Sequence, residues 1–246
     1  MTAELREADH VGKRALVIAH EPFDTAGQIG VRLRARGFEI DTAVMTPDPS
    51  VPEGPPVWPS EPLSADLLLV MGSERSLTDT SAYESWLLDE IELIHTFEET
   101  ARPILGVCFG GQLLAKIHGG SVERSSVMEI GFHRIEPTDG SPVGEGPWMQ
   151  WHHDRFSLPP HAELLAWNEA GPQMFQVGSM VGTQFHPEVD HDHVARWIAG
   201  VSKEYLAEFG LSSDDLLDDL IHNEARNIEQ CHALVDWFLD EVAFPS

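Results

Sequence analysis

The stretch of sequence that decides the fold is GVCFGGQLLA, residues 106–115, in which one cysteine stands between two glycines. The apolar residues 104–107 predict a buried strand that runs into Cys108. A helix is predicted to follow, from Gly110 to about His118, where two further glycines end it. Cys108 therefore stands at a sharp strand-to-helix turn, the arrangement known as a nucleophile elbow, and the flanking glycines leave room for that turn.

A turn of this kind suits a reactive cysteine. The dipole and the free N–H groups at the start of the helix stabilise a thiolate. The backbone N–H of Phe109 is predicted to face the oxygen of an attacked carbonyl group. The alternative is a buried, inert cysteine, and this interpretation fits Cys231 on the apolar stripe of the last predicted helix better than it fits Cys108.

Strands alternate with helices on the amino-terminal side of this turn. Residues 14–19, 38–44 and 66–71 are predicted strands. We expect Asp24 to cap a helix that ends at Gly37, and the pair Ser81 and Glu84 has the spacing of a capping box for a second helix. Residues 46–62 hold seven prolines and are predicted to form a loop.

Short strands are predicted between residues 121 and 185, and the chain after them is predicted to be helical. Apolar residues at a period near 3.6 mark the last helix: Leu217, Leu220, Ile221, Ile228, Cys231, Val235, Phe238 and Val242. The whole order favours an α/β fold of three layers, doubly wound and flavodoxin-like, with a mostly parallel central sheet between flanking helices. We expect one domain over residues 1–246, with a core at about 14–190 and a helical carboxyl-terminal extension at about 191–246. That extension either packs on the core or forms the face of a homodimer.

A second informative segment is GTQFHPE, residues 182–188. Pro187 restricts His186 to an extended conformation. His186 and Glu188 are two residues apart, so their side chains can point the same way. A carboxylate on one ring nitrogen fixes the tautomer and leaves the other nitrogen to serve a cysteine.

Together the two segments resemble the class I glutamine amidotransferases, including the glutaminase domain of GMP synthase. The resemblance covers approximately residues 66–188, and both motifs match in type, spacing and order. Domains of this family hydrolyse glutamine with a catalytic triad and pass ammonia to a synthase partner. The resemblance implies that Cys108 attacks the amide carbon, that His186 delivers a proton to the leaving ammonia and that Glu188 orients His186. Water then hydrolyses the γ-glutamyl thioester.

The resemblance also implies residues that bind substrate. Gln112, one turn beyond Cys108, corresponds to the residue that contacts bound glutamine. The segment WHHDRF, residues 151–156, resembles the family's His-Gly-Asp segment, which assigns His153, Asp154 and Arg155 to the substrate. A plain polar turn is the alternative interpretation of this segment.

The chain departs from the family pattern at three places. The second oxyanion donor is expected at Gly72 or Ser73, where the family usually has Gly-Gly-Pro and this chain has Gly-Ser-Glu. Gly111 stands where many relatives have histidine, and His153 stands where they usually have glycine. A His153 side chain at the rim of the pocket would narrow or change the choice of substrate.

Composition excludes other classes of function. Lys and Arg total 15 against 41 Asp and Glu, a formal net charge of −26, which argues against binding to nucleic acid or to an anionic membrane surface. No signal peptide or membrane span is predicted and two cysteines make no disulfide framework, so the expected location is the cytoplasm. No cofactor is expected. No metal is expected either, because His191 and His193 form an incomplete ligand pattern.

The sequence leaves three functions open. The leading interpretation is a glutaminase that releases ammonia from glutamine, either to a separate synthase chain or without a partner. The second is a stand-alone hydrolase of another γ-glutamyl compound, which shares the chemistry up to the leaving group. The third is a catalytically silent regulatory protein, and the presence of Cys108, His186 and Glu188 together argues against it.

Overall fold

The computed structural model describes residues 9–81 and 83–245. The elements of the first half are β1 (Arg14–Ala19), α1 (Gly27–Ala35), β2 (Glu39–Val44), the 3-10 turn η1 (Pro62–Ser64), β3 (Leu67–Val70), α2 (Glu84–Glu99), β4 (Ile104–Val107) and α3 (Phe109–Ile117). The elements of the second half are β5 (Val122–His133), β6 (Glu136–Pro137), β7 (Trp148–Phe156), β8 (Glu163–Asn168), β9 (Gly171–Val177), β10 (Met180–Thr183), α4 (His191–Gly200), α5 (Lys203–Glu208), α6 (Ser213–Trp237) and the π-helical turn η2 (Phe238–Ala243).

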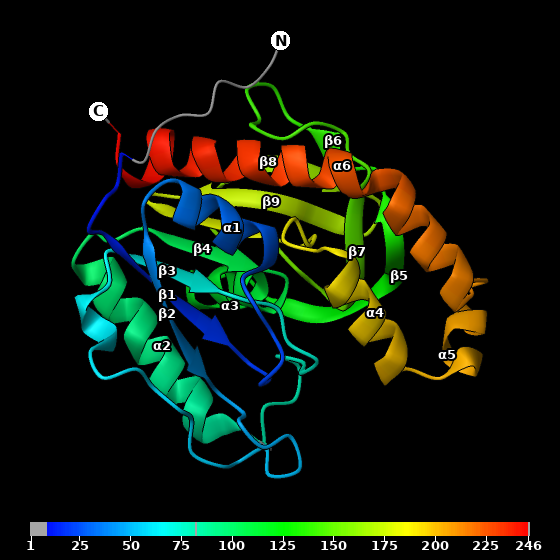
Figure 1. The fold of residues 1–246 in the computed structure, drawn as a ribbon, viewed down its shortest axis with the longest axis horizontal. Coiled ribbons are helices and arrows are strands. Elements are labelled where there is room, and N and C mark those ends of the chain that lie inside the picture. The colour runs from blue at the N-terminus through cyan, green and yellow to red at the C-terminus, as the bar shows by residue number, and fades with distance from the viewer. Residues whose placement is uncertain (1–8, 82, 246) are drawn as a thin grey trace.

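The central sheet has the strand order β2-β1-β3-β4-β10-β9-β8-β6. Its strands from β2 to β10 in that order pair in parallel, and β9, β8 and β6 continue it in antiparallel pairs. A separate antiparallel pair, β5 and β7, lies beside this sheet (Figure 1). Because the parallel strands end at the same edge, the loops after β1, β3, β4 and β10 meet there, which is where α/β sheets bind ligands.

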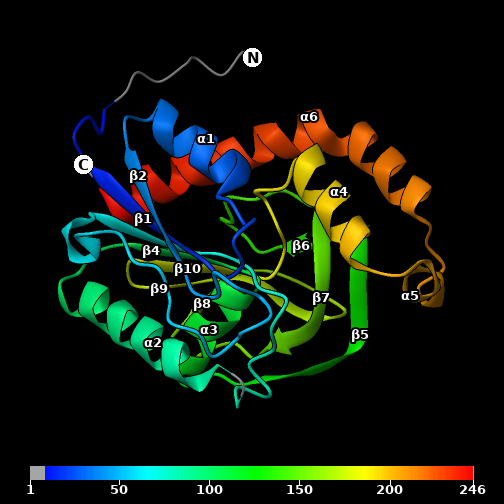
Figure 2. The ribbon, with the colours of Figure 1, turned by 60° about the horizontal axis from the view of Figure 1, so that its bottom comes forward.

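Helices cover both faces of the sheet (Figure 2). On one face, Ile29 of α1 packs in a common cluster with Leu234 of α6 and Phe238 of η2. On the other face, Trp86 of α2 packs in a cluster with Leu113 of α3. The predicted three-layer α/β fold is confirmed, and the carboxyl-terminal helix packs on the core.

Two predicted helix caps are wrong. The Asp24 carboxylate does not cap α1, because it accepts a hydrogen bond from the Glu21 backbone N–H at 3.1 Å. The Ser81 hydroxyl does not cap α2, because it donates to Asp79 at 2.8 Å. In both places a short polar side chain closes a local turn ahead of the helix, and this competes with capping.

The predicted apolar stripe of α6 is wrong at two positions in its first half. Leu220 is buried as predicted, but Leu216 is buried in place of Leu217, and Ile221 is 65% exposed. The sequence offers two adjacent apolar pairs here, so its period cannot select between neighbouring positions. The second half, with Cys231 and Val235 buried, follows the prediction. Across residues 9–81 and 83–245, no helix combines the length and the apolar content needed to cross a membrane.

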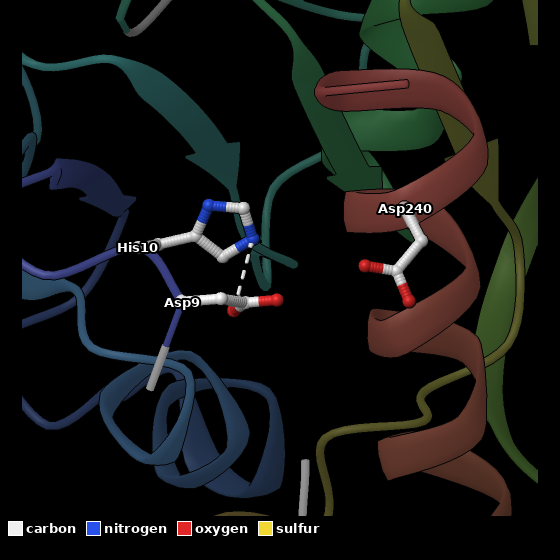
Figure 3. A group of neighbouring side chains, drawn as sticks. All are labelled: Asp9, His10 and Asp240. Carbon is white, nitrogen blue, oxygen red and sulfur yellow. Dashed lines mark ion pairs between the residues drawn. The ribbon is translucent and has the colours of Figure 1, made fainter. Parts of the chain in front are cut away.

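A buried arginine ties the amino-terminal segment and α1 to the end of the chain. The Arg36 side chain is fully buried and donates to Asp9 at 2.8 Å, to Asp236 at 2.8 Å and to Asp240 at 2.6 Å. Figure 3 shows Asp9, His10 and Asp240 gathered at this point, a grouping that resembles a metal site. Because the guanidinium of Arg36 already binds these carboxylates, we interpret the group as an ion-pair cluster.

Candidate active site

Cys108 lies at a strained turn between β4 and α3. Its φ is +50° and its ψ is −104°, a conformation that side-chain-bearing residues rarely adopt. Neighbouring glycines make the turn possible: a Cβ at Gly110 would lie 2.2 Å from the carbonyl oxygen of Val70, and one at Gly106 would lie 2.7 Å from the Gly110 backbone. Such strain is typical of residues held in place for chemistry.

Gly111 is also required by close packing. A Cβ at this position would lie 2.4 Å from the carbonyl oxygen of Thr183, so this backbone has no space for a side chain there. The histidine that many relatives are expected to carry at this place does not fit this chain without a shift of α3 against β10. The close packing of α3 on β10 thus explains why this chain has glycine rather than histidine at position 111.

The structure brings the three predicted triad residues together. Nδ1 of His186 lies 2.7 Å from Oε1 of Glu188, and both side chains are buried. Gly72 lies close to both His186 and Cys108: a Cβ placed on this glycine would lie 3.0 Å from Cε1 of His186 and 3.7 Å from Cβ of Cys108. The backbone N–H of His186 donates to Met149 at 2.8 Å, which fixes the histidine backbone against β7.

Electrostatics around His186 favour its charged form. Burial alone would lower its pKa, but the charge of Glu188 and then that of Cys108 raise the pKa to about 10. His186 can therefore donate a proton beside the Cys108 sulfur, at the amino terminus of α3.

Two residues that the sequence did not suggest hold the His186–Glu188 pair in place. The ring of Trp197 in α4 meets that of His186 edge to face, with centroids 4.8 Å apart. The amide nitrogen of Asn227 in α6 donates to the carbonyl oxygens of Pro187 at 3.1 Å and Val189 at 3.0 Å, on either side of Glu188. The one sequence signal for Asn227 is a polar residue on the buried side of an amphipathic helix.

The loop after β3 is held by a buried charge pair that the sequence did not suggest either. Nδ1 of His20 lies 2.8 Å from the carbonyl oxygen of Gly72, and its Nε2 lies 3.3 Å from both carboxylate oxygens of Glu90. Burial would lower the pKa of His20, but Glu90 raises it to about 9. The ring of His20 also packs edge to face on Phe109, with centroids 4.6 Å apart. Because C=O and N–H point in opposite directions in a trans peptide, the N–H of Ser73 points away from His20.

The predicted substrate residues Gln112 and Asp154 lie together. The side-chain nitrogen of Gln112 donates to the backbone oxygen of Asp154 at 3.1 Å and to Oε1 of Gln184 at 3.3 Å. The Asp154 carboxylate is buried and accepts a hydrogen bond from Ser76, in the loop after β3. Gln112 thus joins α3 to β7 close to the turn at Cys108.

His153 and Arg155 have different surroundings. Nδ1 of His153 lies 2.8 Å from the guanidinium of Arg124, and its Nε2 contacts the hydroxyl of Tyr205. Burial, and then Arg124, lower the pKa of His153. Arg155 instead pairs with Glu123 at the surface, at 2.6 Å, and does not line the cavity. The structure therefore does not place Arg155 where the resemblance implies, because its immediate neighbour Asp154 takes the inward position.

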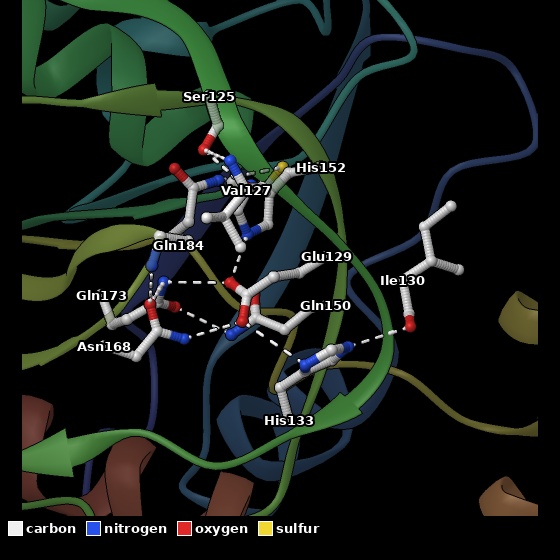
Figure 4. A network of polar contacts seen from close by, with 12 residues as sticks. Ser125, Val127, Glu129, Ile130, His133, Gln150, His152, Asn168, Gln173 and Gln184 are labelled. Carbon is white, nitrogen blue, oxygen red and sulfur yellow. Dashed lines mark hydrogen bonds and ion pairs between the residues drawn. The ribbon is translucent and has the colours of Figure 1, made fainter. Parts of the chain in front are cut away.

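A network of buried polar side chains joins β7 to β5 and β8 (Figure 4). The Glu129 carboxylate accepts hydrogen bonds from Asn168 at 2.8 Å and lies 3.1 Å from Nε2 of His152. Nδ1 of the same histidine lies 3.0 Å from the backbone oxygen of Asp154. A chain of polar contacts thus runs from the β5–β7 pair to the backbone that Gln112 contacts, and it fixes that backbone.

One cavity of about 340 Å³ opens at this edge of the sheet. It is lined by Cys108 and His186, by Gln112, and by His153 and Asp154, together with residues of α4 and α5. A volume near 340 Å³ lies at the lower end of the range for small-molecule sites, roughly 300 to 1,000 Å³.

The histidines of α4 do not form a metal site with each other. Both ring nitrogens of His193 are used: Nδ1 lies 2.7 Å from Asp190 and Nε2 lies 3.0 Å from the Thr25 hydroxyl. Asp190 also caps α4, by accepting the backbone N–H groups of Asp192 and His193. His193 thus serves the start of α4, and its neighbour His191 is exposed.

Comparison with known proteins points to the same family as the two sequence motifs. The family model described as glutamine amidotransferase class-I matches residues 63–198, just over half of the chain. A glutamine amidotransferase-like protein of Salmonella typhimurium, YfeJ, is 28% identical over 93% of this chain and 97% of its own length. A glutamine amidotransferase of Thermotoga maritima has a similar structure, with a TM-score of 0.81 and 28% identity over 94% of this chain and all of that one.

Other relatives match over a shorter region. GMP synthase of Aeropyrum pernix is 38% identical over 40% of this chain, a match that spans 21% of that protein. A subunit of the glutamine-hydrolysing GMP synthase of Pyrococcus furiosus is 34% identical over 41% of this chain and 58% of its own length. The family match contains the loop after β3, Cys108 with α3, and the His186–Glu188 pair. The chain therefore belongs to the class I glutamine amidotransferases.

Proposed function

We propose that this protein is a glutaminase in which Cys108, His186 and Glu188 act as a catalytic triad. The Cys108 sulfur bonds to the side-chain amide carbon of glutamine, and His186 gives a proton to the nitrogen that leaves as ammonia. Glu188 keeps Nδ1 of His186 engaged, so that Nε2 serves the reacting atoms. Water then adds to the γ-glutamyl thioester with His186 as base, which releases glutamate and restores the thiol.

The observation that carries this proposal is the meeting of three separate chain segments at one edge of the sheet. The elbow at Cys108, the His186–Glu188 pair at 2.7 Å and the loop at Gly72 all border one cavity. The N–H groups of Phe109 and Ser73 are the proposed oxyanion donors, since His20 packs on the Phe109 ring and contacts the Gly72 carbonyl of the peptide that carries the Ser73 N–H. A silent regulatory protein has no need of this whole arrangement.

We further infer that a separate synthase chain receives the ammonia. Support comes from relatives whose names describe them as one subunit of a glutamine-hydrolysing GMP synthase. YfeJ, which matches over almost all of both chains, carries no such description. Release of free ammonia without a partner is therefore the competing proposal.

Glutamate release by the purified protein tests the proposal. The substrates are glutamine and a small panel of γ-glutamyl peptides, with the chain alone. Release from glutamine supports the glutaminase. Release only from the peptides favours the second candidate, a γ-glutamyl peptide hydrolase, for which the cavity of about 340 Å³ leaves space beyond a free amino acid. The absence of release from every substrate contradicts a glutaminase that works alone.

The His20–Glu90 pair is expected to position the oxyanion loop. Replacing Glu90 with glutamine removes the charge that favours imidazolium at His20 and weakens its bond to Gly72. We expect kcat to fall about tenfold with little change in KM, since a lost oxyanion donor costs about 10²- to 10³-fold and this loop is only loosened. Glu92→Gln, on the outer side of the same helix, is the matched control. Equal kcat values for Glu90→Gln and the control would contradict a positioning role.

The same pair gives stability a defined pH dependence. The pKa of His20 is raised in the folded protein to about 9, above its ordinary value of 6.5. Its stabilising effect is therefore fully present below pH 6.5 and is lost as the pH rises through 9. Thermal unfolding between pH 6.5 and pH 9.5 should show a smaller decrease in melting temperature for Glu90→Gln than for the wild type.

A further inference from the structure

Gln184 has a buried side chain beside the reaction centre that the proposed triad does not use. It directly follows β10, which pairs in parallel with β4 in a register that places Thr183 opposite Val107. The residues that follow these two strands, Gln184 and Cys108, are therefore neighbours, and the Cys108 backbone N–H donates to the carbonyl oxygen of Thr183 at 2.8 Å. Gln184 is 1% exposed, and its backbone N–H donates to Gln173 at 2.8 Å. The register of the sheet thus holds this amide against the sulfur.

The hydrogen bonds of Gln112 determine which end of the Gln184 amide faces the sulfur. The Gln112 side chain contacts the backbone oxygen of Asp154 at 3.1 Å, and because a carbonyl oxygen only accepts, the contacting atom is the amide nitrogen. The same nitrogen contacts the Gln184 side chain at 3.3 Å, so the atom of Gln184 on this side is its oxygen, Oε1. Nε2 of Gln184 is therefore the atom that faces Sγ of Cys108, at 3.8 Å.

This arrangement gives the sulfur a hydrogen-bond donor. A neutral sulfur accepts hydrogen bonds weakly, and an acceptor that carries negative charge binds a donor roughly twice as strongly as a neutral one. Gln184 is absent from the residues that line the cavity, so its amide reaches the sulfur from the protein interior. Gln184 therefore touches a reacting atom and leaves the space for the substrate unchanged.

We propose that Gln184 is a fourth catalytic residue, whose side-chain N–H donates to the Cys108 sulfur when the γ-glutamyl thioester breaks. The inference rests on the proposed function and assigns a further residue to it. Water loses a proton to His186 and adds to the thioester carbon, and the carbon–sulfur bond then breaks with its electron pair passing to sulfur. His186 returns the proton to sulfur, which leaves the thiol and the new carboxyl group of glutamate. The N–H of Gln184 stabilises the sulfur while it carries the electron pair.

Two substitutions separate this role from a structural one, in which Gln184 only accepts the hydrogen bond of Gln112. Gln184→Met has a similar length without a donor or acceptor, whereas Gln184→Glu keeps the acceptor toward Gln112 and replaces the donor with an oxygen. We expect each to lower kcat about tenfold, the lower end for a hydrogen bond to a charged group, because sulfur is a weak acceptor. KM should change less than about twofold, since Gln184 does not line the cavity. A structural role predicts instead that Gln184→Glu keeps the kcat of the wild type.

Gln176→Met and Gln176→Glu are the matched controls. Gln176 is a glutamine of the neighbouring strand β9 that does not line the cavity, and its side-chain nitrogen donates to the carbonyl oxygen of Gly178 at 3.0 Å. Both controls should keep the kcat of the wild type. Melting temperatures establish that all four variants are folded.

A measurement without turnover tests the contact itself. The two side-chain N–H protons of Gln184 give a pair of signals in a proton–nitrogen NMR correlation spectrum of the wild type, and they are identified as the pair missing from Gln184→Met. Cys108→Ala removes the sulfur, so the signal of the proton that faces it should move. The signal of the other proton on the same nitrogen should move less, and the side-chain signals of Gln176 should stay in place.

The outcomes separate this inference from the glutaminase proposal. A lower kcat in both Gln184 variants, together with the moved signal, supports the role of Gln184. If glutamate is released and either variant keeps the kcat of the wild type, the activity stands and the role of Gln184 is overturned. It is also overturned if kcat falls but the signal stays in place in Cys108→Ala. If the wild type releases no glutamate, the proposed activity fails and the thioester step fails with it.

Discussion

Replacing Cys108 with alanine is expected to lower glutamate release at least about 10³-fold, because no other group can form the thioester. The backbone should tolerate the change, since alanine has the same Cβ as cysteine and the turn depends on the glycines around it. Glutamine should still bind, because the other residues that line the cavity are unchanged. We therefore expect a loss in kcat with an unchanged dissociation constant for glutamine.

The measurement is glutamate release at saturating glutamine, with melting temperature as the check on folding. Cys231→Ala is the matched control: this thiol is also buried, but it lies on α6 in the apolar cluster beneath the sheet. Burial raises the pKa of Cys231, so it stays a thiol and has no part in the proposed reaction. Activity retained in Cys108→Ala, or lost only in Cys231→Ala, would refute the triad.

The second large effect is expected on the free energy of unfolding when Arg36 is replaced. Replacing it with methionine keeps most of the length of the side chain but leaves the carboxylates of Asp9, Asp236 and Asp240 without their shared cation. Breaking a buried ion pair costs about 3 to 5 kcal/mol. We expect about 3 kcal/mol here, the lower end of that range, because these carboxylates are partly exposed and water will compensate them. For a chain of this size the melting temperature should fall by about 6 to 12 °C.

Arg34→Met is the control, because Arg34 lies in the last turn of α1, two residues before Arg36, with its side chain exposed. Its melting temperature should stay within about 2 °C of the wild type. Arg36→Lys should fall between the two, since an ammonium keeps the charge but cannot bind several carboxylates in a fixed fork. A melting temperature of Arg36→Met equal to that of Arg34→Met would contradict the ion-pair cluster.

The sequence predicts those parts of the site that are local in the chain. The elbow at Cys108 is encoded by glycines two residues away on either side, and the His186–Glu188 contact follows from a spacing of two residues. The fold class follows from strands and helices whose period is clear over one element. These features depend on neighbours along the chain, which a pattern can express.

The parts that the sequence did not predict join distant segments. His20 and Glu90 meet across two elements, and Asn227 reaches Pro187 from α6. A lone histidine after a strand or a lone asparagine in a helix has many meanings until the fold brings its partner near. The prediction for Arg155 differs from the structure for another reason: Arg155 lies opposite Glu123 of β5, and its side chain pairs with that carboxylate at the surface.

The hydrogen bonds of Asn227 bear on how such a protein can be divided or recombined. The region that the family model matches ends at residue 198, yet Asn227 and the partners of Arg36 on the last helix lie beyond it. A shortened version that kept only the matched region would lose the two hydrogen bonds from Asn227 to the backbone on either side of Glu188. The carboxyl-terminal helix is thus no removable appendage, and exchanging it for the corresponding helix of a relative should succeed only where that helix supplies an equivalent amide at this one position.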